Sequence, residues 1–211
     1  MGGGLSIVKK LTMDWTFLEI FGTLVGLIYL WLEYKANIYL WIASIVMPAI
    51  NLFVYFNAGL YADFAMDIYY LLMAVYGWIA WRYGLKKKGD GQARPLAITH
   101  LPFRSLPLLA MVWVVLFVAI AQGLIHFTNS TVPWLDSFTT SLSIIGTWML
   151  ARKYVEQWLV WIVVDIVSAY LYAYKGLYFY CGLYSLYVVV AVLGYYKWKA
   201  MMTTDFDSNP H

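Results

Sequence analysis

Seven apolar segments, each about long enough to cross a bilayer, constrain this chain more than any other feature of its sequence. A helix rises about 1.5 Å per residue, so the hydrocarbon layer requires about 20 mostly apolar residues. Of the 211 residues, 63% are hydrophobic and 12% are charged, whereas ordinary globular domains carry about 25% charged residues. The sequence therefore predicts an all-α membrane protein with seven transmembrane helices. The predicted segments are Trp15–Leu32, Ala36–Phe56, Tyr61–Trp81, Ser105–Ile125, Trp134–Ala151, Tyr154–Tyr174 and Leu177–Trp198.

A three-helix unit occurs twice along the chain. Matching residues recur at two constant separations, 120 residues in the early part of the unit and 117 in the later part. The pairs are Gly26 with Gly146, Trp41 with Trp161, Gly59-Leu60-Tyr61 with Gly176-Leu177-Tyr178, Gly77 with Gly194 and Trp81 with Trp198. Three helices and one linking helix return the chain to its starting side, so the 3+1+3 arrangement predicts parallel repeats. We expect a first repeat over 15–81, a basic linker over 82–104, a linking helix over 105–125 and a second repeat over 134–198.

Basic residues predict the orientation in the membrane. The side that holds the N-terminus carries only Lys9, Lys10 and Lys175. The opposite side carries Lys35, Arg82, Lys86, Lys87, Lys88, Arg94, Arg104, Arg152, Lys153, Lys197 and Lys199. By the positive-inside rule, the linker and the C-terminus are cytoplasmic and the N-terminus is outside.

The sixth segment contains a single acid near its middle, Asp165. An ionisable group at that depth costs roughly 2.5–3.5 kcal/mol on insertion scales, so such residues usually line a site or a pathway. Helical spacing places Trp158, Trp161, Asp165, Ser168 and Tyr172 on one face, which would suit a flat organic cation. The alternative is a structural role, in which Asp165 hydrogen-bonds a neighbouring helix and the tryptophans pack or anchor the helix at the interface.

Broken symmetry between the repeats indicates the other walls of this predicted site. Asp67 and Tyr70 share one face of the third segment, whereas the equivalent positions of the seventh segment hold Tyr184 and Tyr187. Asn51 in the second segment is a further candidate for a ligand hydrogen bond, and a helix–helix hydrogen bond is an equally good interpretation. Gln157 and Glu156 begin the sixth segment near the cytoplasmic surface, and Glu156 is expected to pair with Arg152 at i, i+4.

Few other function classes fit the composition. The single cysteine, Cys181, excludes an internal disulfide, and the three histidines are too scattered to predict a metal site or another cofactor. An enzyme would need a nucleophile with a base or paired carboxylates, which the segments do not supply. A membrane scaffold remains as the alternative to a transporter. Nucleic-acid binding is not indicated, because membrane topology accounts for the basic linker.

Three sequence stretches resemble the PnuC family of bacterial vitamin transporters. They are YADFAMDIYYLLMAVYGWIAW in the third segment, EQWLVWIVVD in the sixth and the YKGLYF turn that follows it. The resemblance extends from Trp15 to Trp198 and implies a fold similar to the SWEET sugar transporters. It also implies uptake of nicotinamide riboside across the inner membrane by facilitated diffusion, with a cytoplasmic kinase trapping the vitamin. Some family members carry thiamine or riboflavin instead, and the family commonly forms trimers.

The charge of each vitamin determines how well it fits the predicted site around Asp165. Nicotinamide riboside and thiamine each carry one fixed positive charge on a flat ring, which indole faces can bind by cation–π contact worth roughly 0.5–2 kcal/mol. Asp165 would supply the counter-charge. Riboflavin is neutral and needs no acid, so it ranks below the two cations. The residues do not decide between nicotinamide riboside and thiamine, and the riboside leads only through the resemblance.

Overall fold

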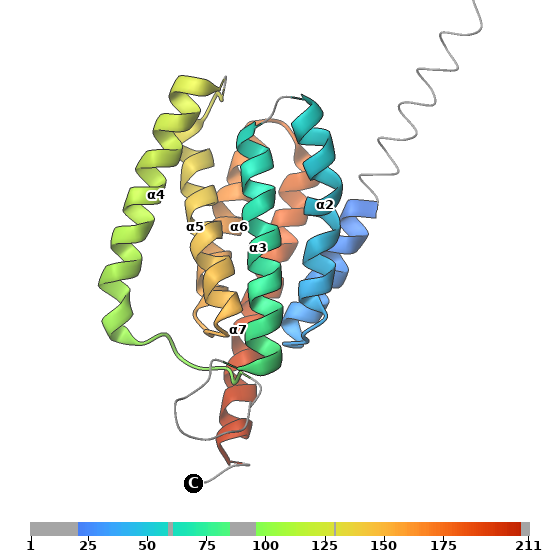
Figure 1. Ribbon diagram of the computed structural model, residues 1–211, viewed down its shortest axis with the longest axis vertical. Helices are drawn as coiled ribbons and strands as arrows, with labels where there is room; N and C mark the ends of the chain where they lie inside the picture. Colours follow the sequence, from blue (N-terminus) through green and yellow to red (C-terminus); the bar gives the residue numbers. More distant parts are fainter. Residues whose placement is uncertain (1–20, 59–60, 85–95, 129, 208–211) are drawn as a thin grey trace, which may run out of the picture. The chain divides into compact units, whose positions relative to one another are not determined.

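The part of the chain that the structure describes folds almost entirely into helices (Figure 1). The computed structural model describes residues 21–58, 61–84, 96–128 and 130–207. The helices are Phe21–Tyr34, α2 (Leu40–Ala58), α3 (Tyr61–Tyr83), the short 3-10 helix η1 (Phe103–Ser105), α4 (Leu106–Phe127), α5 (Pro133–Ala151), α6 (Gln157–Tyr174) and α7 (Tyr178–Asp207). The predicted all-α fold with seven long helices is confirmed. Residues 15–20 of the first predicted segment lie outside the described residues.

Five of the described helices are long and apolar enough to cross a membrane. These spans are Leu40–Asn57, Phe64–Tyr83, Phe103–Phe127, Gln157–Tyr174 and Tyr178–Thr203. The helix Phe21–Tyr34 is shorter in its described part, and α5 has the length but carries an acid and several hydroxyl groups. The chain is thus a multi-pass membrane protein.

The chain forms two compact units, Met1–Val75 and Tyr76–His211. The boundary falls inside α3, before Trp81, where the first sequence repeat is predicted to end. The boundaries predicted from the repeats therefore stay predictions.

Helix α5 is the most enclosed helix of the second unit. It packs against α4 on one side and α6 on the other, while α6 packs mainly against α7. Eight α5 residues are buried, whereas α4 buries only Ala121. Five of the six hydroxyls of α5 are bonded within their own helix; for example, Ser143 Oγ donates to the Thr139 carbonyl and Thr147 Oγ1 to the Ser143 carbonyl. This local bonding lets a hydroxyl-rich helix lie inside the unit without orphaned donors.

Part of the basic linker docks on the turn between α5 and α6. We call residues 98–101 the docked segment. The Thr99 amide donates to the Lys153 carbonyl at 3.1 Å, and the Val155 amide donates to the Thr99 carbonyl at 3.0 Å. These bonds form an isolated parallel bridge between Thr99 and Tyr154. Because Tyr154 belongs to this bridge, α6 begins at Gln157 and not at the predicted Tyr154.

Glu156 closes this contact. Its Oε2 accepts the Leu101 amide at 2.8 Å, and its Oε1 lies 2.6 Å from His100 Nδ1. The predicted pairing of Glu156 with Arg152 is therefore wrong. An i, i+4 pair needs a continuous helix, and Lys153, with a φ of 54°, breaks the helix between the two residues. Arg152 Nη1 instead donates to the Tyr76 hydroxyl at 3.4 Å, and this bond raises the pKa of its guanidinium.

An aromatic cluster joins α3, α6 and α7 at this end of the second unit. The Trp198 ring lies 6.1 Å from the Trp81 ring and 5.7 Å from the Trp158 ring, between centroids. Trp81 Nε1 donates to the Leu150 carbonyl at 3.3 Å, and Lys153 Nζ lies 4.3 Å from the Trp81 ring centroid.

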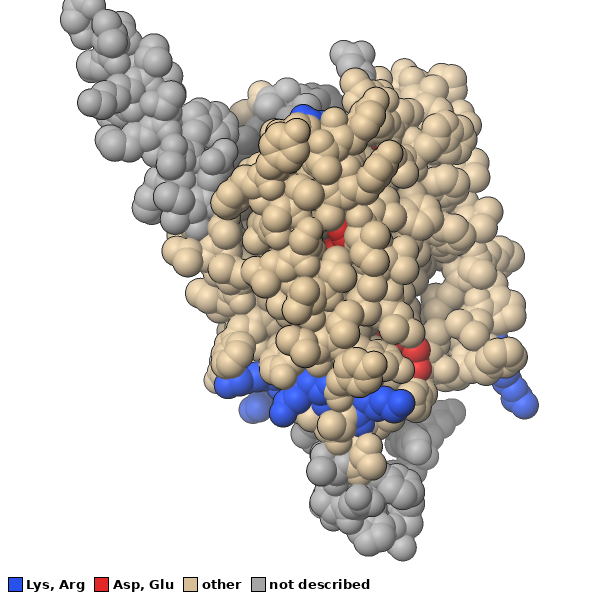
Figure 2. All heavy atoms as spheres, turned by 180° about the vertical axis from the view of Figure 1, so that it is seen from behind, with Lys and Arg blue, Asp and Glu red and all other residues tan. Residues whose placement is uncertain are grey.

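Figure 2 shows Lys and Arg gathered in a band on the face in view, with uncharged residues over most of the remainder.

Trp198 is expected to be a main determinant of stability in the second unit. It is fully buried between two other indoles, so Trp198→Ala should open a cavity and lower the free energy of unfolding by about 3–5 kcal/mol. Thermal unfolding in detergent would measure the loss. Tyr196→Ala, at a neighbouring position that is 65% exposed, is the matched control and should change the melting temperature little. Similar losses in both variants would contradict the packing described here.

Glu156 is expected to hold the docked segment in place. Glu156→Ala removes the acceptor of the Leu101 amide and the partner of His100, so hydrogen exchange at Leu101 should become roughly tenfold faster. Exchange measured by mass spectrometry over residues 96–105 would test this. Asp136→Ala removes a different paired acid at the start of α5 and should leave that peptide unchanged. Unchanged exchange in Glu156→Ala would mean that the backbone bridge alone holds the segment.

Candidate functional site

Four of the predicted site residues lie on one face of α6, at its spacing of three and four. Trp158, Asp165 and Ser168 are buried, and Trp161 is partly buried. The helix forms here because a nearly unbroken apolar run follows the turn that the docked segment fixes. The predicted face is therefore turned toward other helices of the second unit.

Trp158 lies deepest in the contact between α6 and α7. Its side chain is 1% exposed, and its ring meets the Trp198 ring edge-on at an interplanar angle of 88°. Its indole Nε1 is buried and has no hydrogen-bond acceptor among the described residues. Trp158 thus combines the predicted packing role with an unmatched donor.

Trp161, one turn further along α6, lies against Gly146 of α5. Its Nε1 is also buried without an acceptor among the described residues. Because buried donors are nearly always hydrogen-bonded in folded proteins, two unmatched indole donors one turn apart point to a polar ligand.

Gln157 is a candidate that the sequence interpretation missed. Its side chain is fully buried, and neither Oε1 nor Nε2 has a hydrogen-bond partner among the described residues. The sequence placed Gln157 at the membrane surface, where water would satisfy an amide. The burial of Gln157 depends on the other helices that pack over it in the second unit, so no local sequence pattern indicates it.

Asp165 faces α7. It lies near enough to the phenols of Tyr184 and Tyr187 for its charge to act on both. The two phenol rings are 5.4 Å apart, and Tyr184 also packs on Tyr172 of α6 at 5.1 Å, between centroids. The second unit thus brings the acid of α6 together with two of the predicted tyrosines of α7, beside an aromatic wall.

The remaining predicted residues, Asn51, Asp67 and Tyr70, belong to the first unit. Asp67 is buried, and its charge acts on the Tyr70 phenol one turn along α3. Asn51 is partly buried in α2. Their contribution to a common site with α6 stays a prediction.

A second buried acid in the first unit, Glu33, was not predicted. It is 2% exposed and hydrogen-bonds the phenol of Tyr29 one turn earlier. No sequence pattern indicated its burial, because Glu33 directly follows the last residue of the predicted first segment and precedes Lys35. Both units therefore contain buried carboxyl groups close to phenols.

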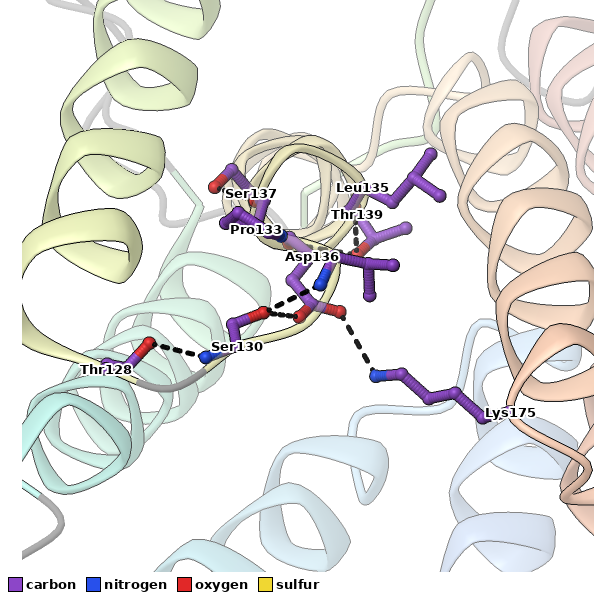
Figure 3. A network of polar contacts seen from close by, with 9 residues as sticks. Thr128, Ser130, Pro133, Leu135, Asp136, Ser137, Thr139 and Lys175 are labelled. Carbon is purple, nitrogen blue, oxygen red and sulfur yellow. Dashed lines mark hydrogen bonds and ion pairs between the residues drawn. The ribbon is translucent and has the colours of Figure 1, made fainter.

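A separate polar network joins α4, α5 and the turn after α6 (Figure 3). Ser130 Oγ donates to Asp136 Oδ2 at 2.6 Å, and Lys175 Nζ lies 3.7 Å from Asp136 Oδ1. Ser130 also accepts the Val132 amide and donates its own amide to Thr128 Oγ1. Each of these groups has a hydrogen-bond or ion-pair partner, so the network is structural. It lies at the opposite end of α5 from the docked segment.

Comparison with known proteins finds similar sequences among membrane transporters. Residues 16–200 match the family described as nicotinamide mononucleotide transporter. A nicotinamide riboside transporter, PnuC, from Escherichia coli strain K12 is 23% identical over 214 residues, covering 88% of this chain and 86% of the relative. A riboflavin/roseoflavin transporter, RibM, from Streptomyces davaonensis is 25% identical and covers 85% of this chain and 83% of its own.

A solved structure confirms the fold. The crystal structure of a vitamin B3 transporter, PnuC, superposes with a TM-score of 0.67 and 22% identity, covering 95% of this chain and 88% of that one. At this identity the likeness establishes the fold alone. Taken with the match over residues 16–200, it shows that this chain belongs to the nicotinamide mononucleotide transporter family, whose members include the PnuC proteins.

Proposed function

We propose that this protein takes up nicotinamide riboside across the bacterial inner membrane. The observation that carries the proposal is the buried Asp165 of α6, beside the phenols of Tyr184 and Tyr187, in a chain of a transporter family. A carboxylate in this apolar setting is costly alone, and a bound organic cation offsets that cost.

The chemistry of the riboside matches the groups on α6 and α7. Its pyridinium ring carries one fixed positive charge, which Asp165 would counter and which the Trp161 ring would meet face-on. Its hydroxyl and carboxamide oxygens would accept hydrogen bonds from the unmatched indole donors of Trp158 and Trp161. The Gln157 amide could both donate a hydrogen bond to the riboside and accept one from it. Asn51, Asp67 and Tyr70 are proposed as further ligand-binding residues.

Thiamine is the second candidate, because it also carries a fixed positive charge on a flat ring. Riboflavin ranks third, since a neutral ligand leaves the Asp165 carboxylate without a counter-charge, although one relative is named as its transporter. Transport is proposed to be facilitated diffusion, driven by a cytoplasmic kinase that phosphorylates the vitamin and traps it. A homotrimer in the membrane is the proposed assembly. The protein itself is proposed to catalyse no reaction.

Isothermal titration of the purified protein tests the proposal directly. Nicotinamide riboside, thiamine, riboflavin and the mononucleotide are titrated in parallel. We expect the riboside to bind more tightly than its mononucleotide, because no Lys or Arg lies in the first six predicted segments and Lys197 lies at the end of the seventh. A buried phosphate would then lack a counter-charge. Equal affinity for riboside and mononucleotide would overturn the charge argument, and binding of riboflavin alone would replace the proposed substrate.

Asp165→Asn should weaken riboside binding while the fold survives. The amide keeps the shape of the side chain and removes its charge, so the dissociation constant should rise roughly 5- to 150-fold, or about 1–3 kcal/mol. Titration calorimetry measures the loss, and thermal unfolding without ligand is the control. An unchanged dissociation constant with a lower melting temperature would give Asp165 a purely structural role.

Trp161→Ala should weaken binding far more than Trp31→Ala. Trp161 is partly buried on the proposed site face, whereas Trp31 is 57% exposed near the end of the first helix. Removing a ring that contacts the ligand should cost about 1 kcal/mol or more. The same titration compares the two variants, and equal losses would move the site away from α6.

The termini are proposed to follow the positive-inside rule, with the N-terminus outside and the C-terminus in the cytoplasm. In a Cys181→Ser background, a cysteine at exposed Lys199 should react with a membrane-impermeant maleimide only in inverted vesicles. A cysteine at exposed Thr131, between α4 and α5, should react only in intact cells. The reverse pattern would contradict this orientation.

A further inference from the structure

Two glycines on the helices beside α6 lie directly against its two indoles. Gly194 of α7 faces Trp158, and Gly146 of α5 faces Trp161. A Cβ built on Gly194 would lie 2.7 Å from Cε2, Cζ2 and Cη2 of the Trp158 ring. Real Cβ atoms essentially never come closer than 3.0 Å to another heavy atom. Position 194 therefore tolerates only glycine while Trp158 keeps its place.

The Trp158 ring has little room to move away from a larger side chain at position 194. It is 1% exposed, and its other neighbour, the Trp198 ring, is fully buried. The three atoms that a Cβ would meet belong to a rigid six-membered ring and not to a flexible chain end. A methyl group at position 194 would thus turn the indole or part α6 from α7, and overpacking of this kind carries a measurable cost.

Gly146 is a milder case of the same contact. A Cβ there would lie 3.3 Å from Val160 Cγ1 and 3.4 and 3.5 Å from Cε2 and Cζ2 of Trp161. These distances are tight but require the neighbours to give by only a few tenths of an ångström. Gly182, also in α7, provides a contrast, because a Cβ there meets no heavy atom within 4 Å.

We propose that Gly194 is a positioning residue of the substrate site. It allows the Trp158 indole to lie flat against the α7 backbone and so fixes the orientation in which α6 presents Trp158 beside Trp161 and Asp165. Gly146 supports Trp161 in the same way with more tolerance. The inference rests on the proposed function, because it assigns the glycines a role in the site on α6. Binding walls must hold their geometry to within about 0.5 Å, which a glycine contact with rigid backbone provides.

A graded series of alanine substitutions tests the proposal, with nicotinamide riboside as the probe in isothermal titration. We expect Gly194→Ala to raise the dissociation constant about tenfold or more, Gly146→Ala to raise it about two- to threefold, and Gly182→Ala to leave it unchanged. Calorimetry reports the affinity of the folded fraction separately from its amount. A Gly194→Ala protein that melts lower but binds with an unchanged constant would overturn the proposal.

A second variant pair keeps the test decisive if Gly194→Ala does not fold. Trp158→Leu removes all three ring atoms that the new Cβ would meet, so Gly194→Ala in that background should fold. The double variant should bind the riboside with the same constant as Trp158→Leu alone, since Gly194 acts through the indole. A further loss in the double variant would overturn the proposal. The wild-type titration separates failure of the proposed function from failure of the positioning role. If the wild-type protein does not bind the riboside, the proposed function is wrong. If the wild-type protein binds it and all three glycine variants bind it with the same dissociation constant, only the positioning role is wrong.

Discussion

The need to satisfy every polar group away from water governs this molecule. In a bilayer each unmatched backbone group costs several kcal/mol, which leaves helices as the workable form for the long apolar segments of this chain. The same need extends to side chains. Most hydroxyls of α5 donate to carbonyls of their own helix, as Thr147 does to Ser143. The acids Glu156 and Asp136 have an amide and an ammonium partner, respectively. Against this background, Gln157, Trp158 and Trp161 of α6 each have a buried polar atom without a hydrogen-bond partner among the described residues, and Trp113 of α4 is a further case.

The buried polar groups of α6 differ in kind, which is informative about a ligand. Asp165 is a charge, Trp158 and Trp161 are donors, and Gln157 is both a donor and an acceptor. All four lie within about two and a half turns of one helix, next to phenols of α7. A purely structural helix contact would need no such variety, whereas a charged nucleoside presents a ring, a charge and several hydroxyls at once. The packing role of Trp158 and the proposed binding role of Trp161 are compatible, because the packed Trp158 ring would fix the helix face from which Trp161 projects.

The sequence predicted the elements better than their contacts. Apolar length predicted the helices, and helical spacing predicted which residues share a face of α6, because both depend on local periodicity. Tyr184 and Tyr187 were indicated instead by the broken symmetry between the repeats. The partner of Glu156 was missed, since a break at Lys153 and a docked linker segment are products of tertiary structure. Gln157 and Glu33 were missed for a related reason: each lies at the edge of a predicted segment, and burial at an edge depends on what packs over it. The ring contacts of Gly146 and Gly194 required coordinates, although the repeat had singled out both positions.

The bonding of α5 has a mechanical consequence. Its hydroxyls are engaged with its own backbone, so a lengthwise shift of α6 or α4 along this helix would break none of these side-chain bonds. Polar contacts with other segments are found instead in its first turn, where Asp136 bonds Ser130 and Lys175, and beyond its last residue, at the docked segment. Resistance to such a shift therefore comes from side-chain packing, as at Gly146 against Trp161, and from the polar contacts near the two ends of α5.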